Sequence, residues 1–205
     1  MTVKLASHFY AMIDAAGGHE PRALAEVYLD TGVKVMQLRM KDTPGRELLA
    51  AARAIAELSR ARGVTFIIND RVDIALLAGA DGVHLGQNDL PLAAARKLVG
   101  AKMLIGISTH TIEQARVAEA GGANYVGFGP MYSGGLKEIV TGQGIEMLRA
   151  VRAAVRIPVV AIGGITETRL PEVLAAGADA AAIITDVVRA RDVAAKVDSI
   201  LKLVP

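Results

Sequence analysis

Side chains that could bind a metal and an anion follow several short apolar runs of the chain. In residues 66–90, "FIINDRVDIALLAGADGVHLGQNDL", one apolar run ends at Asn69 and Asp70, and Asp89 stands a few residues past the next. The chain has no cysteine, which excludes disulfides and thiolate metal sites. Two facing carboxylates then favour a hard cation such as Mg²⁺, held by one or two carboxylates together with phosphate oxygens. An alternative is that each acid caps the helix after it.

A second candidate group lies in "QLRMK" (37–41). Gln37, Arg39 and Lys41 share one face of an extended chain, because strand side chains alternate. Two cations and an amide on one face are suited to a polyphosphate or a carboxylate. Arg39 stands in an apolar run, where an unpaired charge would be costly, so a bound ligand is favoured over a solvated strand end.

The elements that must position these groups alternate regularly. Amphipathic stretches such as 45–63 and 111–122 have apolar residues at helical spacing, and several end on glycine. Eight alternating strands and helices predict a (β/α)8 TIM barrel, one domain over residues 1–205, with its chemistry at the carboxyl ends of the strands. The predicted strands are 9–13, 33–38, 64–68, 82–85, 103–107, 125–128, 159–162 and 180–184.

Composition limits the class of protein. Hydrophobic residues make up 52% of the chain but aromatic residues only 3%, which suits parallel strands covered by alanine-rich helices. The net charge of +2 without a basic run argues against a nucleic-acid partner. The first residues lack a signal-peptide core, and no window reaches the ~18 apolar residues of a membrane span. We expect a soluble, cytoplasmic protein with no membrane partner.

A further anion site is expected at the ends of the last two predicted strands. The glycine pair in "AIGGI" (161–165) allows close backbone approach, and Thr185 and its neighbours open the last helix, whose N–H groups favour an anion. Lys137, in the long segment after residue 128, could reach the same anion. Ser108 and His110 invite a nucleophile and base interpretation, but no acid is placed to orient the histidine, so Ser108 is better used as a phosphate or leaving-group donor. His84 suits a packed strand residue or a ligand contact equally well.

These segments resemble a known family. "QLRMKD", "IINDRVDIALLAGADGVHLGQNDL", "IGISTHT", "YVGFGP" and "VVAIGGIT", in this order, are similar to the thiamine phosphate synthases. The resemblance implies a (β/α)8 barrel that joins 4-amino-2-methyl-5-pyrimidinylmethyl diphosphate to thiazole phosphate. The products are thiamine monophosphate and pyrophosphate, Mg²⁺ is required, and pyrophosphate leaves before the new bond forms.

The resemblance also implies roles for individual residues. Asp70 and Asp89 would bind Mg²⁺, and the pyrimidine diphosphate would be held by Gln37, Arg39, Lys41 and Asn69. Ser108 and Lys137 would contact the pyrophosphate, with the pyrimidine amino group and the thiazole phosphate as alternative contacts. Gly164, Ile184 and Thr185 would cradle the thiazole phosphate. The implied catalytic residues are Arg39, Lys41, Ser108 and Lys137, and the implied substrate-binding residues are Gln37, Arg39, Lys41, Asn69, His84, Ser108, Lys137, Gly144, Gly164, Ile184 and Thr185.

One segment departs from the family pattern. After "GFGP" the family usually has Thr-x-Thr-Lys, but this chain has "MYSGGLKEIVTGQG" (131–144), in which Gly134 and Leu136 replace the threonines. The segment is closer to that of the related thiazole tautomerases, whose characteristic histidine is Pro130 here. A tautomerase-like enzyme and a non-catalytic barrel that binds thiamine intermediates therefore stay open as alternatives. An unrelated sugar- or indole-phosphate isomerase is disfavoured, because no lysine lies inside predicted strands three to six. A homodimer stays open as the oligomeric state.

Overall fold

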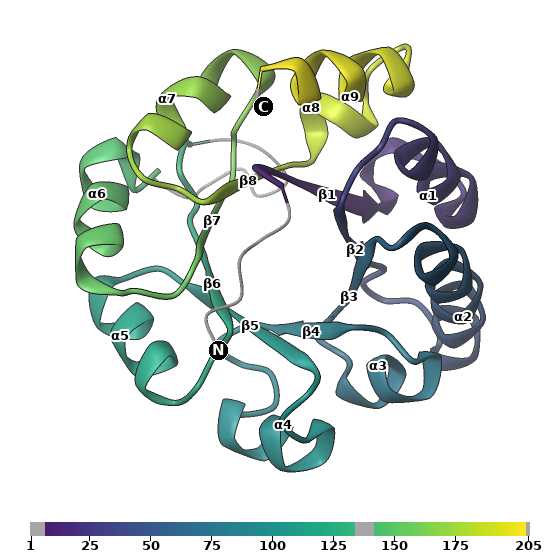
Figure 1. The fold of residues 1–205 in the computed structure, drawn as a ribbon, viewed down its shortest axis with the longest axis horizontal. Helices are drawn as coiled ribbons and strands as arrows, with labels where there is room; N and C mark the ends of the chain where they lie inside the picture. The colour runs from purple at the N-terminus through teal and green to yellow at the C-terminus, as the bar shows by residue number, and fades with distance from the viewer. Residues whose placement is uncertain (1–6, 134–141, 204–205) are drawn as a thin grey trace.

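The computed structural model describes residues 7–133 and 142–203. Eight parallel strands form a closed barrel in chain order, and β1 pairs with β8 to complete it (Figure 1). The predicted (β/α)8 barrel is therefore confirmed. The strands are β1 (Phe9–Asp14), β2 (Val35–Arg39), β3 (Thr65–Asn69), β4 (Gly82–Leu85), β5 (Leu104–Thr109), β6 (Tyr125–Phe128), β7 (Val159–Ile162) and β8 (Ala180–Ile183).

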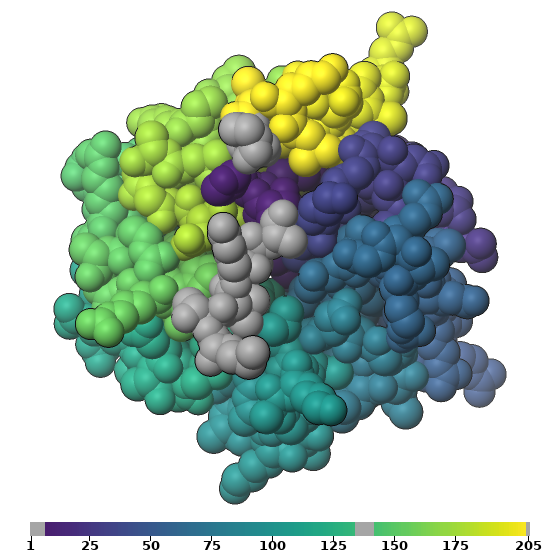
Figure 2. All heavy atoms as spheres, viewed as in Figure 1, coloured from purple at the N-terminus to yellow at the C-terminus, as the bar shows by residue number. Residues whose placement is uncertain are grey.

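Helices form the outer layer of the barrel, and in Figure 1 they surround the ring of strands on every side. The space-filling view shows the same face with all heavy atoms, and its colours follow the chain around the barrel from purple through teal and green to yellow (Figure 2). The helices are α1 (Pro21–Asp30), α2 (Gly45–Arg62), α3 (Val72–Ala78), α4 (Leu92–Val99), α5 (Ile112–Ala120), α6 (Gly144–Ala154), α7 (Leu170–Ala175), α8 (Thr185–Val188) and α9 (Val193–Lys202). Two 3₁₀ turns are also present, η1 (Ala15–Gly17) and η2 (Glu167–Arg169).

The core has two parts because strand side chains alternate between two faces. The larger part lies between the strands and the helices and is dominated by Ala, Val, Ile and Leu, as the composition predicts. The smaller part fills the inside of the barrel and contains Tyr10, Met12 and Tyr125. On β8 the inward positions are Ala180 and Ala182, and Ala182 is the register partner of Tyr10. Small residues on one strand thus leave room inside the barrel for a large ring on its neighbour.

The ends of three helices differ from the prediction. Helix α3 begins at Val72 after Arg71, and α4 begins at Leu92 after Pro91, with no side-chain cap in either case. The capping interpretation of Asp70 and Asp89 is therefore wrong, and both acids lie in the loops that precede the helices. Thr185 does not open the last helix, because it begins the four-residue α8, and α9 follows it.

None of the helices in the described ranges is both long and apolar enough to cross a membrane.

The predicted glycine stops are present where they were expected. Gly63 and Gly79 end α2 and α3 with φ of 64° and 67°, in the left-handed region that glycine adopts at little cost. Such abrupt stops keep the turns that lead into β3 and β4 short.

Candidate functional site

A cavity of about 370 Å³ opens at the carboxyl ends of the strands, and we call it the mouth cavity. Its floor is formed by inward-facing side chains of the barrel, including Tyr10, Tyr125 and Ala182. Nine residues singled out from the sequence line it together: Gln37, Arg39, Lys41, Asn69, Asp70, His84, Asp89, Ser108 and His110. They come from β2, β3, β4 and β5 and from the loops after them, so the closure of the barrel is what brings them to one place.

The remaining predicted residues do not line this cavity. Gly164 and Thr185 follow the neighbouring strands β7 and β8, and Ile184 lies just before Thr185. Gly144 is the first residue of α6. Lys137 lies outside the described residues, as do Gly134, Leu136 and Thr141, so the expectations for the strand 6 loop are not tested by the structure.

Arg39 is paired with an acid of the neighbouring strand. Its Nη1 lies 2.5 Å from Oδ2 of Asp14, whose side chain is only 4% exposed. Asp14 Oδ1 also accepts a hydrogen bond from the backbone of Ala16, which holds the carboxylate in place. The charge of Arg39 is thus compensated without a ligand, and burial of this charge alone does not require one. The pairing instead fixes the direction in which the guanidinium faces the cavity.

The two predicted metal ligands lie next to each other in the mouth cavity. Burial raises the pKa of Asp70 to about 6, together with a side-chain hydrogen bond and charge repulsion from Asp89. Lys41 and Arg39 act in the opposite direction, and Lys41 Nζ lies 3.8 Å from Asp70 Oδ2. Two close carboxylates that resist full ionisation form a site at which a divalent cation would relieve the repulsion.

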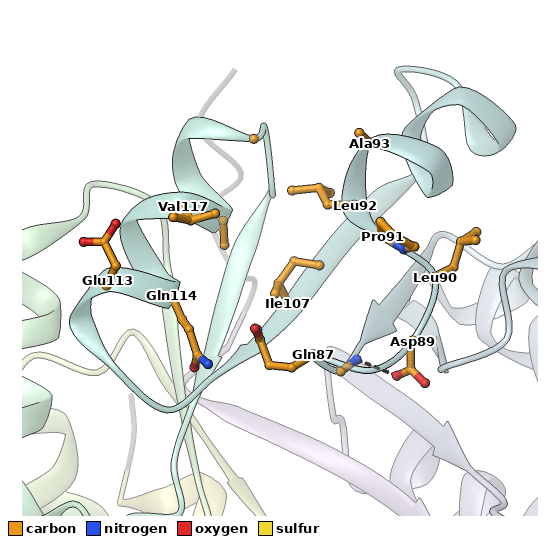
Figure 3. A pocket seen from close by; sticks show the side chains of 13 residues that line it. Gln87, Asp89, Leu90, Pro91, Leu92, Ala93, Ile107, Glu113, Gln114 and Val117 are labelled. Carbon is orange, nitrogen blue, oxygen red and sulfur yellow. Dashed lines mark hydrogen bonds between the residues drawn. The ribbon is translucent and has the colours of Figure 1, made fainter.

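The backbone around these two acids is arranged to hold them there. Asp70 has φ of 62°, an unusual value for a residue other than glycine, and its N–H donates to the carbonyl of His84. Asp89 Oδ2 accepts a 2.6 Å hydrogen bond from the backbone N–H of Gly86, drawn as a dashed line in Figure 3. A Cβ on Gly86 would lie 2.9 Å from that oxygen, so the close approach favours glycine. Strained loop geometry of this kind is common at functional sites.

The donor set agrees with Mg²⁺ better than with a transition metal. Among residues 7–133 and 142–203, no three His, Cys, Asp or Glu side chains are grouped to hold a metal ion. Mg²⁺ needs no such cage, because it is commonly bound by one or two carboxylates plus water and substrate phosphates. Asp70 and Asp89, beside Lys41 and Arg39, fit that pattern.

His84 and Ser108 form a pair that the sequence did not predict. His84 Nε2 lies 2.9 Å from Ser108 Oγ, and His84 Nδ1 lies 3.0 Å from the hydroxyl of Tyr125. Burial lowers the pKa of His84 to about 4, so the ring is neutral near pH 7. His110 also lines the cavity but has a different partner, with Nδ1 2.6 Å from the carbonyl of Gly129. The nucleophile and base interpretation of Ser108 with His110 therefore finds no support, since the two side chains have separate partners.

A second hollow lies beside the mouth cavity, between α4 and α5 (Figure 3). It has a volume of about 410 Å³ and shares Gly86, Gln87 and Asp89 with the mouth cavity. The rest of its lining is mostly apolar and includes Leu92 and Val117. Apart from Asp89, its charged lining in the described residues is Glu113, so this hollow is unsuited to the anions that the mouth cavity could hold.

The loop after β7 has the close backbone approach expected of a phosphate cradle. Gly163 and Gly164 have φ of 99° and 67°, and a Cβ on Gly164 would lie 2.9 Å from Cβ of Tyr132. Arg169 Nη1 donates to the carbonyl of Gly164 and its guanidinium lies 4.2 Å from the centre of the Tyr132 ring. Arg169, which was not predicted as a site residue, thus places a cation beside the glycine pair.

Comparison with known proteins agrees with this arrangement. A family model described as thiamine monophosphate synthase matches residues 9–187. The chain belongs to this family. A thiamine-phosphate synthase of Moorella thermoacetica is 48% identical over 180 residues, covering 87% of this chain and 86% of the relative. One of Pelotomaculum thermopropionicum is 46% identical over 177 residues, covering 86% and 81%.

A solved structure of this family is also similar. The thiamine phosphate pyrophosphorylase from Pyrococcus furiosus superposes with a TM-score of 0.89 at 33% identity, and the match covers 96% of this chain and 95% of that one. The family, the fold and the class of enzyme predicted from the sequence are therefore confirmed. The assignment of individual site residues stays a prediction.

Two tyrosines on the floor of the mouth cavity were not predicted from the sequence. Tyr10 and Tyr125 are 2% and 1% exposed, and both line the mouth cavity. A signal was available, because Tyr10 and Asp14 share the inward face of a strand by alternation. Tyrosine hydroxyls need partners when buried, so inward tyrosines on barrel strands indicate a polar network at the floor.

Proposed function

We propose that this protein is a transferase that joins 4-amino-2-methyl-5-pyrimidinylmethyl diphosphate to thiazole phosphate. The bond between the pyrimidine methylene carbon and the diphosphate oxygen breaks, and the thiazole nitrogen forms the new bond to that carbon. Pyrophosphate leaves with the bonding electrons, so no proton is gained or lost in the exchange. The observation that carries this proposal is the convergence of Arg39, Lys41, Asp70 and Asp89 on one cavity, in a chain of this family.

The reaction asks the protein to position two small substrates and to stabilise charge on a leaving group. Arg39 and Lys41 supply positive charge at the mouth, and Ser108, which also lines the cavity, supplies a hydroxyl. Asn69, at the end of β3, adds an amide on the same side as Asp70. No side-chain nucleophile is required when the leaving group departs first, which agrees with the separate partners of Ser108 and His110.

Asp70 and Asp89 would hold Mg²⁺. When bound, the cation would neutralise charge on the diphosphate and so favour its departure as pyrophosphate. The raised pKa of Asp70 supports this role, because the two carboxylates face each other with only partial compensation from Lys41 and Arg39. The thiazole phosphate would lie against the backbone of Gly164 and the start of α8 at Thr185, with Lys137 of the strand 6 loop and Gly144 at the start of α6 contributing.

The test is pyrophosphate release from purified protein given both substrates, with and without Mg²⁺. We expect release that needs both substrates and the metal and that is lost in Asp70→Ala. Asp73→Ala is the matched control, because Asp73 is an exposed carboxylate on α3 paired with Arg71, outside the mouth cavity. Binding of the pyrimidine diphosphate without any turnover would contradict the proposal and favour a non-catalytic barrel. Conversion of the thiazole alone would favour a tautomerase.

A further inference from the structure

The polar groups on the floor of the mouth cavity form one unbroken series of hydrogen bonds, which we call the interior chain. Gln37 Nε2 donates to the hydroxyl of Tyr10 (2.9 Å), and the hydroxyls of Tyr10 and Tyr125 are 2.9 Å apart. The series continues through the two ring nitrogens of His84 to Ser108 Oγ. Its two ends, Gln37 and Ser108, both line the cavity.

The direction of every bond in the interior chain follows from its first donor. Tyr10 accepts from Gln37, so its single proton is donated to Tyr125, and the proton of Tyr125 is then donated to His84 Nδ1. A neutral imidazole that accepts at Nδ1 carries its proton on Nε2 and donates to Ser108. The Ser108 hydroxyl therefore keeps its own proton for another acceptor, and within the described part of the chain Oγ has no other hydrogen-bond partner.

The packing around the two tyrosines in the middle of the interior chain excludes water. Tyr10 and Tyr125 are almost fully buried. Gly106 of β5 lies beside the rings of His84 and Tyr125 and leaves room for them. A Cβ at this position would lie 2.5 Å from His84 Nδ1 and 2.1 Å from Cζ of Tyr125. With no solvent at the two tyrosines to interrupt the series, their hydroxyl protons must reorient together.

We propose that Tyr10 and Tyr125 are positioning residues that couple the amide orientation of Gln37 to the proton direction of Ser108. The cavity then presents an acceptor, Gln37 Oε1, at one end of the interior chain and a donor, the Ser108 hydroxyl, at the other. A ligand must offer a donor to the first and an acceptor to the second. Given the proposed function, on which this assignment of the ligand rests, a 4-aminopyrimidine has both groups, an amino donor and ring-nitrogen acceptors.

The tautomer of His84 reports the direction without any ligand. In the direction described above the ring proton is on Nε2. If the first residue could only accept from Tyr10, every bond would reverse, and His84 would carry its proton on Nδ1 and accept from Ser108. A change at Gln37 should thus alter the proton position on a histidine three hydrogen bonds away.

The experiment is ¹⁵N NMR of the ligand-free protein at about pH 8, with His84 assigned by its loss in His84→Gln. We expect the Nε2–H tautomer in the wild type. In Gln37→Glu, at a pH where the carboxyl carbon shift shows ionisation, the carboxylate can only accept, and we expect the Nδ1–H tautomer. In Gln37→Met, which neither donates nor accepts, the two ring-nitrogen shifts should converge because both tautomers are populated.

Tyr28→Phe is the matched control. Its hydroxyl is buried and donates to the carbonyl of Met12, outside the interior chain, so a similar hydrogen bond is lost while the His84 tautomer should not change. An Nδ1–H tautomer in the wild type would overturn the proposal. Wild-type His84 shifts in both Gln37 variants would also overturn it.

A second measurement asks whether the interior chain positions the ligand. By calorimetry, Tyr125→Phe should bind the pyrimidine diphosphate about tenfold more weakly than the wild type, and Tyr28→Phe should bind it equally well. Equal binding by Tyr125→Phe would overturn the positioning role. No binding by the wild type would instead contradict the proposed function, and the tautomer measurement would still decide the direction of the chain.

Discussion

The guanidinium of Arg39 lies 2.5 Å from the carboxylate of Asp14, at the carboxyl ends of neighbouring strands. Asp14 and Arg39 are also register partners across β1 and β2. This pair compensates a largely buried acid and holds a cation at the edge of the mouth cavity. A charge-assisted hydrogen bond of this kind limits the orientations that the guanidinium can adopt. The pair is therefore a preorganised part of the candidate leaving-group site.

Arg39→Ala should lower the turnover of pyrophosphate release by at least ~10²-fold, by analogy with the loss of oxyanion-stabilising donors. The physical reason is that positive charge beside the departing diphosphate is lost. Steady-state kinetics with saturating Mg²⁺ measures this. Arg22→Ala is the control, because Arg22 is exposed and paired with Glu26 on α1. Full activity of Arg39→Ala would contradict the assignment.

Asp14→Asn should lower turnover by about tenfold, because the amide can still accept from Ala16 but no longer holds Arg39 by charge. Since Asp14 acts through Arg39, the double variant should be no slower than Arg39→Ala. A double-mutant cycle on turnover measures this coupling. Additive losses in the double variant would show that Asp14 has an independent role.

Mg²⁺ affinity should fall as the pH is lowered through about 6, because burial and the neighbouring Asp89 raise the pKa of Asp70 to that value. Below this pH the carboxyl is protonated and cannot bind a cation; above it, the carboxylate is available. Calorimetric titration with Mg²⁺ at about pH 5 and about pH 8 makes the comparison. In Asp89→Asn the pKa of Asp70 should be lower than in the wild type, which carboxyl ¹³C NMR can measure. An unchanged pKa of Asp70 in this variant would contradict the prediction.

Asp70→Asn should stabilise the metal-free protein at about pH 8 but not at about pH 3. The folded-state pKa of Asp70 is raised above the value of 3.8 expected without perturbation, so its charged form opposes folding once the pH rises through about 6. Below 3.8 the carboxyl is protonated in both states and makes no such contribution. Thermal unfolding at the two pH values tests the sign. An equal change in Tm at both would point to a cause other than charge.

Gly164→Ala should destabilise the protein by roughly 1–3 kcal/mol, because φ at this position is 67° and a Cβ would lie 2.9 Å from Cβ of Tyr132. It should also raise the KM for thiazole phosphate more than that for the pyrimidine diphosphate, if the phosphate lies against this backbone. Chemical denaturation and kinetics measure the two effects. Gly18→Ala is the control, with a similar φ of 70° and open space around its Cβ position.

The barrel itself was predictable from local patterns. Each strand is a short apolar run, and glycine stops mark several helix ends. Three of the eight predicted strands have the same bounds in the structure. Differences at the other strands are of one or two residues. Polar side chains such as Asn69 and Thr109 continue the ladder at some carboxyl ends, and apolar residues such as Val64 and Met103 lie outside it at some amino ends. Strand ends are set by backbone pairing with neighbours, which an apolar pattern does not report.

The types of side chain at the mouth and the period-two alternation of "QLRMK" were set by the sequence, and they were enough to indicate an anion and a divalent cation at the strand ends. The pairing of Asp70 with Asp89 was also expected, but only the tertiary structure decided two other partners: Asp14 for Arg39, and His84 rather than His110 for Ser108. The physical reason is that each partner comes from another strand or loop, so the contact exists only once the barrel has closed. Local spacing tells which face a side chain takes, and the register of neighbouring strands determines what it meets there.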